Sequence, residues 1–351
     1  MINVILPFLT ISMIDDRTCM GISNRGTLAG LDDVLDRREQ ENLSVRTIEL
    51  FLKLGLNFFD TAWTCEQSRP TECSAVRSLN CDTTSEAVLG YAISQFGRKK
   101  FVVSTKFHVQ NVQSFQNNLA PTVSSISTLS ANQSSLSDGN SIEKIIRSQL
   151  AASLRRLGTD FIDLYYQQES TDDHMVIDEV MLCLKTLVRE RKIRYIGLSA
   201  SCGETIRRAH GIHPITAVFT EYSFQNRVIE HEALKVCREL GIGIIARYPY
   251  GSSTVSPDYP VRRGSDPRGS PEKKIKKSTS NFLDLATEKN CTPNQLALGW
   301  LHAQGIDIFP LIESNSAETV FEAFLALKSH LYGTDVEEIG TFRLSDSKLT
   351  E

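Results

Sequence analysis

The chain has 351 residues, a length that allows one large α/β barrel or two ordinary domains. Its 41% hydrophobic and 23% charged residues are typical of a folded globular protein and exclude wholesale disorder. The formal net charge of −4 gives no sign of a nucleic-acid partner or an anionic membrane partner, and no apolar run approaches the roughly 18 residues of a membrane helix.

Helical and strand patterns alternate along most of the chain. The apolar segment 1–10 lacks a basic start and is interpreted as a buried strand, not as a secretion signal. The predicted helices are 44–54, ending at Gly55, then 85–96, 141–157, ending at Gly158, 178–191, 204–210, 231–240, 280–289 with 295–303, and 318–329. The predicted strands are 56–59, ending at Asp60, then 101–105, 161–167, 193–199, 217–223, 243–248 and 306–312.

This order of elements predicts a parallel sheet, because strands that alternate with helices pair through right-handed crossovers. With a first strand near residues 19–23 there are eight βα units, the number that closes a (β/α)₈ barrel of the TIM type. A doubly wound sheet is the competing fold, but it usually carries a G-x-G-x-x-G turn after its first strand, and none is present here. The sequence therefore predicts one α/β barrel domain over residues 1–351.

Three polar insertions interrupt the alternation, at 66–84, 110–140 and 252–280, and they follow predicted strands, which places them on the C-terminal face of the barrel. Residues 110–140 are rich in Ser, Asn and Gln, a composition expected to stay disordered because it buries too little apolar area. The 8 cysteines form no Cys-x-x-Cys pair. Scattered reduced thiols in a cytoplasmic protein are therefore favoured over a redox or metal site, the alternative that the even spacing of Cys65, Cys73 and Cys81 leaves open.

Several segments, in the same order along the chain, resemble those of the aldo-keto reductases. They are GLNFFDTA at 55–62, STKF at 104–107, LRRLGTDFIDLYYQ at 154–167, KIRYIGLS at 192–199, HPITAV at 213–218 and TPNQLALGWL at 292–301. The resemblance covers about residues 40–330 and is greatest to the branch with plant auxin-induced-type reductases and potassium-channel β subunits. It implies a (β/α)₈ barrel that binds NADP(H) without a Rossmann motif and reduces small carbonyl compounds.

The resemblance also implies a catalytic group of four side chains. In the family, a tyrosine protonates the carbonyl oxygen as hydride leaves the nicotinamide, a lysine lowers the pKa of that tyrosine, an aspartate holds the lysine, and a histidine orients the carbonyl. A phenol needs such a nearby cation, because its ordinary pKa near 10 makes it a poor proton donor at neutral pH. Carried over to this chain, the aspartate is Asp60 and the lysine is Lys106, both at C-terminal strand ends.

The other two catalytic positions depart from the family pattern. The tyrosine position holds Cys65, whose thiol is much shorter than a phenol and is expected to become a reactive thiolate beside Lys106. The histidine position holds Gln168, which donates a hydrogen bond but has no proton to transfer. His108 and His174 lie near these positions in sequence, and either is an alternative acid, although solvated loop histidines are favoured.

The family's cofactor positions are altered as well. The nicotinamide contacts correspond to Ser199 and Ala200, to Phe219 in place of a glutamine, and to the neighbouring Tyr222. The phosphate clamp Pro-Gly-Thr-Lys-Arg corresponds to residues 312–316, so Ser314, Asn315 and Ser316 stand where a threonine, a lysine and an arginine are expected, and the adenine contact is reduced to Glu322. Each lost charge-assisted bond is worth on the order of 1.5–3 kcal/mol. We therefore expect NADP or NAD to bind weakly or not at all, without preference for NADP.

Two functional hypotheses remain. One is a noncatalytic or impaired barrel with a binding or sensing role, which the joint change of catalytic and phosphate positions favours. The other is an active, divergent oxidoreductase that reduces aldehydes or ketones with NAD(P)H, using Cys65 or another acid.

Overall fold

The computed structural model describes nine stretches of the chain, namely residues 10–12, 37–61, 85–109, 139–167, 174–200, 202–251, 282–313, 317–326 and 333–342. The predicted insertions 66–84 and 252–280, and nearly all of 110–140, lie outside the described residues.

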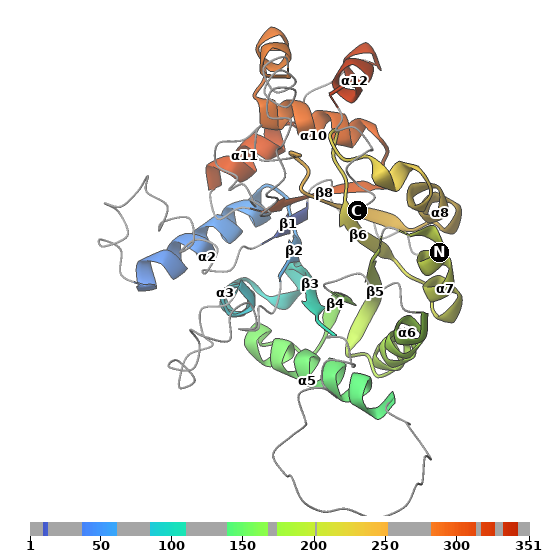
Figure 1. Cartoon of the computed structure of the whole chain (residues 1–351). Helices are drawn as coiled ribbons and strands as arrows, with labels where there is room; N and C mark the ends of the chain where they lie inside the picture. The colour runs from blue at the N-terminus through green and yellow to red at the C-terminus, as the bar shows by residue number, and fades with distance from the viewer. Residues whose placement is uncertain are drawn as a thin grey trace, which may run out of the picture.

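Eight parallel strands form a closed barrel in which strand order follows chain order (Figure 1). The strands are β1 (Thr10–Ser12), β2 (Phe58–Asp60), β3 (Val102–Phe107), β4 (Ile162–Gln167), β5 (Ile193–Ser199), β6 (Ala217–Glu221), β7 (Gly243–Arg247) and β8 (Ile308–Glu313). The seam lies at β1, where Ile11 aligns with Phe59 of β2 and with Ile312 of β8. The predicted (β/α)₈ architecture is confirmed.

Helices surround the strands on the outside of the barrel (Figure 1). They are α2 (Arg37–Lys53), α3 (Ser85–Phe96), α5 (Gly139–Leu157), α6 (His174–Arg189), α7 (Gly203–Ile212), α8 (Ala233–Leu240), α10 (Pro293–Ala303), α11 (Ala317–Ala326) and α12 (Gly333–Gly340), with 3₁₀ turns η2 (Arg98–Lys100) and η3 (Val228–Glu230) and a helical stretch at 282–288. Within the described residues, no helix combines the length and the apolar character that crossing a membrane requires.

The position of the first strand was predicted incorrectly. The strand that closes the barrel is Thr10–Ser12, at the end of the apolar opening segment, whereas residues 19–23 lie outside the described residues. Ile11, next to this apolar segment, pairs with Phe59 of β2 and with Ile312 of β8. The need to pair with both strands decides where the first strand lies. α2 begins seven residues before the predicted helix, because its polar first turns carry no apolar periodicity, and α12 was not predicted.

The side chains of the strands form two apolar layers, as expected for alternating residues of a barrel. The larger layer lies between the strands and the helices. The inner layer fills the barrel and consists of Phe58, Leu164, Tyr166, Ala217, Phe219, Ile245 and Leu311. A residue two positions beyond an inner residue on the same strand faces the same interior, which decides which polar side chains reach the C-terminal mouth.

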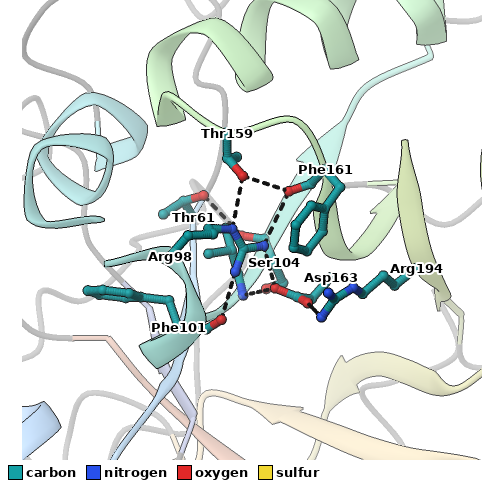
Figure 2. A network of polar contacts seen from close by, with 9 residues as sticks. Thr61, Arg98, Phe101, Ser104, Thr159, Phe161, Asp163 and Arg194 are labelled. Carbon is teal, nitrogen blue, oxygen red and sulfur yellow. Dashed lines mark hydrogen bonds and ion pairs between the residues drawn. The ribbon is translucent and has the colours of Figure 1, made fainter. Parts of the chain in front are cut away.

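A polar network around Asp163 links β3, β4 and β5 near their N-terminal ends, opposite the mouth (Figure 2). The Asp163 carboxylate accepts hydrogen bonds from Arg98 at 2.6 Å, from Arg194 at 2.9 Å and from the backbone N–H of Val103 at 2.9 Å. Phe161 contacts both guanidinium groups, with Arg98 4.2 Å and Arg194 4.0 Å from its ring centroid. These hydrogen bonds connect the beginnings of β3, β4 and β5. They lie at the N-terminal end of the barrel, which in this fold usually contributes to stability.

Candidate active site

The strongest candidate for a functional site is an ion pair inside the C-terminal mouth of the barrel. Asp60 is the last residue of β2, and Lys106 lies next to the end of β3. The register pairs Asp60 with Ser104, so Lys106 stands two residues further on and faces the same interior. The lysine ammonium pairs with Asp60 Oδ2, and the two residues are 6% and 0% exposed. The structure therefore brings together the two catalytic candidates that the motifs indicated.

Three neighbouring groups hold this pair in place. Asp60 Oδ1 accepts hydrogen bonds from the Ser104 hydroxyl and, at 2.7 Å, from the Tyr166 hydroxyl. Lys106 Nζ also donates to the carbonyl oxygen of Thr61 at 3.2 Å. Both carboxylate oxygens are thus engaged, which satisfies a buried charge that would otherwise be costly.

Gly197 on β5 makes the position of Tyr166 possible. A Cβ atom at residue 197 would lie 3.1 Å from Tyr166 Cβ and 3.4 Å from Leu164 Cδ1. Because contacts of 3.1 Å are tighter than carbon atoms normally tolerate, a larger residue at 197 would push Tyr166 out of place. The small residue on β5 therefore sets the geometry of a hydroxyl that contacts Asp60 from β4.

A second cation lies next to this cluster. The ring of Phe219, near the end of β6, has Lys106 Nζ 5.2 Å from its centroid and Arg247 Cζ 5.7 Å from it. Tyr166 packs against the same ring with a centroid distance of 5.0 Å. Phe219 is thus a shared neighbour of an ammonium, a guanidinium and a second aromatic ring.

The other predicted catalytic residues, Cys65 and Gln168, lie outside the described residues. His108 is described: its backbone N–H and carbonyl oxygen are hydrogen-bonded to the Gln149 side chain at 2.9 and 2.8 Å. The motifs did not single out Ser104, Tyr166 or Arg247. A signal for Tyr166 was present, because alternation along the predicted strand 161–167 places it on the same face as Leu164, two residues earlier.

The predicted cofactor residues do not gather at one place. Ser199 follows Gly197 by two positions and faces the mouth, as does Phe219. Ala200 and Tyr222 are instead buried in the outer apolar layer. The Tyr222 hydroxyl donates to Glu230 at 2.8 Å, and burial in turn raises the pKa of this phenol.

Glu322 on α11 is likewise engaged with protein groups. Its carboxylate accepts hydrogen bonds from the hydroxyl of Thr292 and from Asn294 Nδ2 at 3.3 Å. Ser314, Asn315 and Ser316 lie outside the described residues. The described members of the predicted cofactor set therefore offer a dinucleotide one hydroxyl, at Ser199, and the ring of Phe219, which has two cations near it. This donor set does not fit a nicotinamide dinucleotide by itself.

Two cavities of the structure lie away from the mouth. One of about 440 Å³ is lined by Arg227, Trp300 and Gln304 together with residues of α12. The other, of about 400 Å³, lies at the N-terminal end next to Phe161 and Arg194. Neither is lined by Asp60 or Lys106. The placement of the candidate site therefore rests on the ion pair and its strand-end position, not on a cavity.

Comparison with known proteins identifies the family of this chain. The aldo/keto reductase family matches residues 27–342. A probable aldo-keto reductase 1 from Glycine max is 33% identical over 329 residues, covering 91% of this chain and 84% of the relative.

Solved structures resemble the chain at the level of fold. An aldo/keto reductase from Klebsiella pneumoniae, in complex with NADP and acetate, superposes with a TM-score of 0.58 at 19% identity, covering 86% of this chain and 85% of that one. An apo aldo-keto reductase from Bacillus halodurans gives a TM-score of 0.60 at 21% identity, covering 86% and 87%. With a family match over most of its length and a buried Asp–Lys pair at the mouth of a closed barrel, the chain belongs to the aldo/keto reductase family.

Proposed function

We propose that this chain is an aldo-keto reductase-like protein in which carbonyl reduction is impaired and binding or sensing of a small ligand is the main role. The observation that supports the proposal is the Asp60–Lys106 pair, which retains the electrostatic half of the family site. The proton-donating half is replaced, because Cys65 and Gln168 occupy the tyrosine and histidine positions. General acid catalysis contributes typically about 10²–10⁴-fold, so its loss leaves a trace rate.

The same proposal includes a weakened cofactor site. Asn315 and Ser316 replace the lysine and arginine that would bind the 2′-phosphate of NADP, and Glu313 adds negative charge at the end of β8. Tyr222 and Glu322 have their side-chain oxygens committed to protein partners. NADP(H) is the cofactor that the family implies, and this chain is expected to bind NADPH no better than NADH.

A second candidate function is an active, divergent oxidoreductase, and the buried pair is also the observation that favours it. Removing two charges from water costs several kcal/mol per ion, which is a reason to expect a use for them. The Lys106 ammonium carries protons and stands at the mouth, where it can protonate a carbonyl oxygen directly. In that case activity depends on Lys106 and does not require a phenol.

The deciding experiment compares three forms of the full chain with a neutral test aldehyde. They are the wild type, the variant with Cys65→Tyr, Gln168→His, Asn315→Lys and Ser316→Arg, and the same variant with Lys106→Met. We expect reduction only in the fourfold variant. Titration with NADPH and NADH, followed by the fluorescence of Trp63 and Trp300, should show NADPH preference in both forms that carry Asn315→Lys and Ser316→Arg, and none in the wild type.

The other outcomes are equally informative. Wild-type turnover at an ordinary family rate would overturn the proposal, and the loss of that turnover in a wild-type chain that carries Lys106→Met alone would establish the second candidate. Submicromolar binding of NADPH by the wild type, with clear discrimination against NADH, would contradict the weakened cofactor site.

A further inference from the structure

Arg247 occupies a position from which it can contact a ligand in the mouth. It is the last residue of β7, and it follows Ile245, a member of the inner apolar layer, by two positions. The Arg247 side chain therefore faces the barrel interior one layer above Ile245, on the C-terminal side where Asp60 and Lys106 lie.

The charge of this half-buried guanidinium is not balanced within the described part of the chain. Arg247 makes no ion pair there, in contrast to Lys106, which is paired with Asp60. Its partner in the strand register is Glu221 of β6, an exposed residue that also makes no ion pair among the described residues. Charged groups that leave bulk water are normally paired, so a half-buried, unpaired arginine suits an anionic ligand.

Two aromatic rings hold the guanidinium instead of a carboxylate. Arg247 Cζ lies 4.4 Å from the ring centroid of Tyr248 and 5.7 Å from that of Phe219. Tyr248 has a φ of +52°, a left-handed conformation that is strained for a residue with a side chain. Contacts with ring faces leave the in-plane N–H donors of arginine available, and their fork matches the two oxygens of a carboxylate.

We propose that Arg247 is an anion-binding residue of the mouth and that the ligands of this protein are carbonyl compounds that carry a carboxylate. Phe219 is shared by Arg247 and Lys106, each within 5.7 Å of its centroid, so one small molecule can present its carboxylate to the guanidinium and its carbonyl oxygen to the ammonium. The proposal deepens the proposed function, on which it rests for the role of Lys106.

The test measures binding of three small probes to the full chain without cofactor, by isothermal titration calorimetry. The probes are 4-oxobutanoate, butanoate, which lacks the carbonyl group, and butanal, which lacks the carboxylate. We expect 4-oxobutanoate to bind at least about tenfold more tightly than butanal at low salt, with the difference shrinking as salt is added. Arg247→Gln should abolish the difference, and Arg247→Lys should restore only part of it, since an ammonium lacks the planar fork.

Two further variants make the result specific. Glu221→Gln removes the carboxylate that faces Arg247 in the register, and it should tighten binding of both carboxylate probes. Arg207→Gln, on the outside of the barrel in α7, causes the same change of net charge as Arg247→Gln and should leave all three probes unaffected.

Unchanged binding of 4-oxobutanoate in Arg247→Gln would overturn the proposal. A lower melting temperature of this variant with unchanged binding would show that Arg247 makes a structural contact, and it would overturn the proposal as well. Weaker NADPH binding in Arg247→Gln with unchanged 4-oxobutanoate binding would assign the guanidinium to the cofactor and also overturn it. The proposed function fails separately. If 4-oxobutanoate binds through Arg247 and the wild type reduces it at an ordinary family rate, the anion site stands and the impairment is refuted.

Discussion

Tyr165 and Tyr166 are neighbours on β4 with identical side chains and opposite surroundings. Tyr166 faces the barrel interior and donates its hydroxyl proton to Asp60 at 2.7 Å. Tyr165 points outward, packs against Phe107 at 4.9 Å, and has a buried hydroxyl without a hydrogen-bond partner in the described part of the chain. Burial raises the pKa of the Tyr165 phenol, which therefore stays neutral. Alternation along one strand thus gives one tyrosine to the site and the other to the core.

The two tyrosines provide a matched pair of substitutions. Tyr166→Phe removes a hydrogen bond from a buried carboxylate and should lower the free energy of unfolding by about 1.5–3 kcal/mol. Tyr165→Phe removes a hydroxyl that is buried without a partner and should be neutral or stabilising by about 1 kcal/mol. Urea unfolding of both variants checks this pair, and equal effects would contradict the difference in surroundings that the structure shows.

His210 gives the stability a dependence on pH. Its Nδ1 accepts a hydrogen bond from the backbone N–H of Ile215 at 3.2 Å, and burial, with a smaller effect of His213, lowers the pKa of the imidazole. The unfolded chain therefore takes up a proton near pH 6.5 while the folded chain resists it. The contribution of neutral His210 to the free energy of unfolding is complete above this pH and is lost as the pH falls through it.

We therefore expect the melting temperature to fall between about pH 8 and about pH 5.5, and to fall less in His210→Gln, whose amide oxygen can accept the same bond without titrating. His302, whose pKa is also lowered by burial, leaves part of the effect in that variant. An identical pH dependence in His210→Gln and the wild type would show that His210 plays no part.

At the scale of the element, strands and helices with strong periodicity were predictable from the sequence. β5 and α3 have the predicted boundaries, and Gly55 and Gly158 end their helices with φ values of +86° and +59°. The start of α2 was not predictable, because its first turns are polar and lack the apolar periodicity of a helix that packs on a core. β1 is three residues long and is recognisable as a strand only once its neighbours β2 and β8 exist.

The site was predictable only in part, for a similar reason. The motifs located Asp60 and Lys106, since strand-end positions follow from chain order in a barrel. The resemblance also placed Tyr222 among the cofactor positions, which stays a prediction; in the structure its strand ends at Glu221 and its hydroxyl donates to Glu230. Contacts of this kind depend on which way a side chain points after a strand ends, and spacing along the sequence does not specify that direction.

The start of α10 supports a prediction at the level of one helix. Thr292 caps the helix, with its hydroxyl accepting from the N–H of Gln295 at 3.1 Å while the Gln295 side chain accepts from the N–H of Thr292 at 3.1 Å. The same hydroxyl donates to Glu322 of α11. Thr292→Ala should cost about 1 kcal/mol of stability, and Thr292→Ser should cost much less. Thermal unfolding of the two variants checks the cap, and equal losses would contradict it.

At the scale of the whole molecule, charge is used differently at the two ends of the barrel. The N-terminal end contains Asp163 with two arginines, which stabilise the frame (Figure 2). The C-terminal mouth instead carries Asp60, Lys106 and Arg247. The arrangement agrees with the general division of (β/α)₈ barrels into a stabilising and a functional end.

This division predicts a contrast between two aspartates. Asp163→Asn takes the charge from a carboxylate whose side chain is 5% exposed and leaves two arginines without their partner, which should cost about 3 kcal/mol. Asp178→Asn breaks an ion pair with Arg208 whose side chains are 36% and 43% exposed, and it should cost less than about 1 kcal/mol. Denaturant midpoints of the two variants test the contrast, which comparable losses would refute.

The seam of the barrel has a consequence for the order in which the chain folds. Each strand from β1 to β7 pairs with the next strand in the chain. The last strand, β8, pairs instead with β1, so the pairing of Ile11 with Ile312 joins segments roughly 300 residues apart. Closing so long a loop is entropically costly before other contacts form, so the seam should assemble last and open first. Before the seam closes, the edges of β2 and β8 are unpaired, and this open sheet is the species that pairs most readily with another chain during synthesis. The three residues of β1 cover both edges and so protect the finished barrel from aggregation.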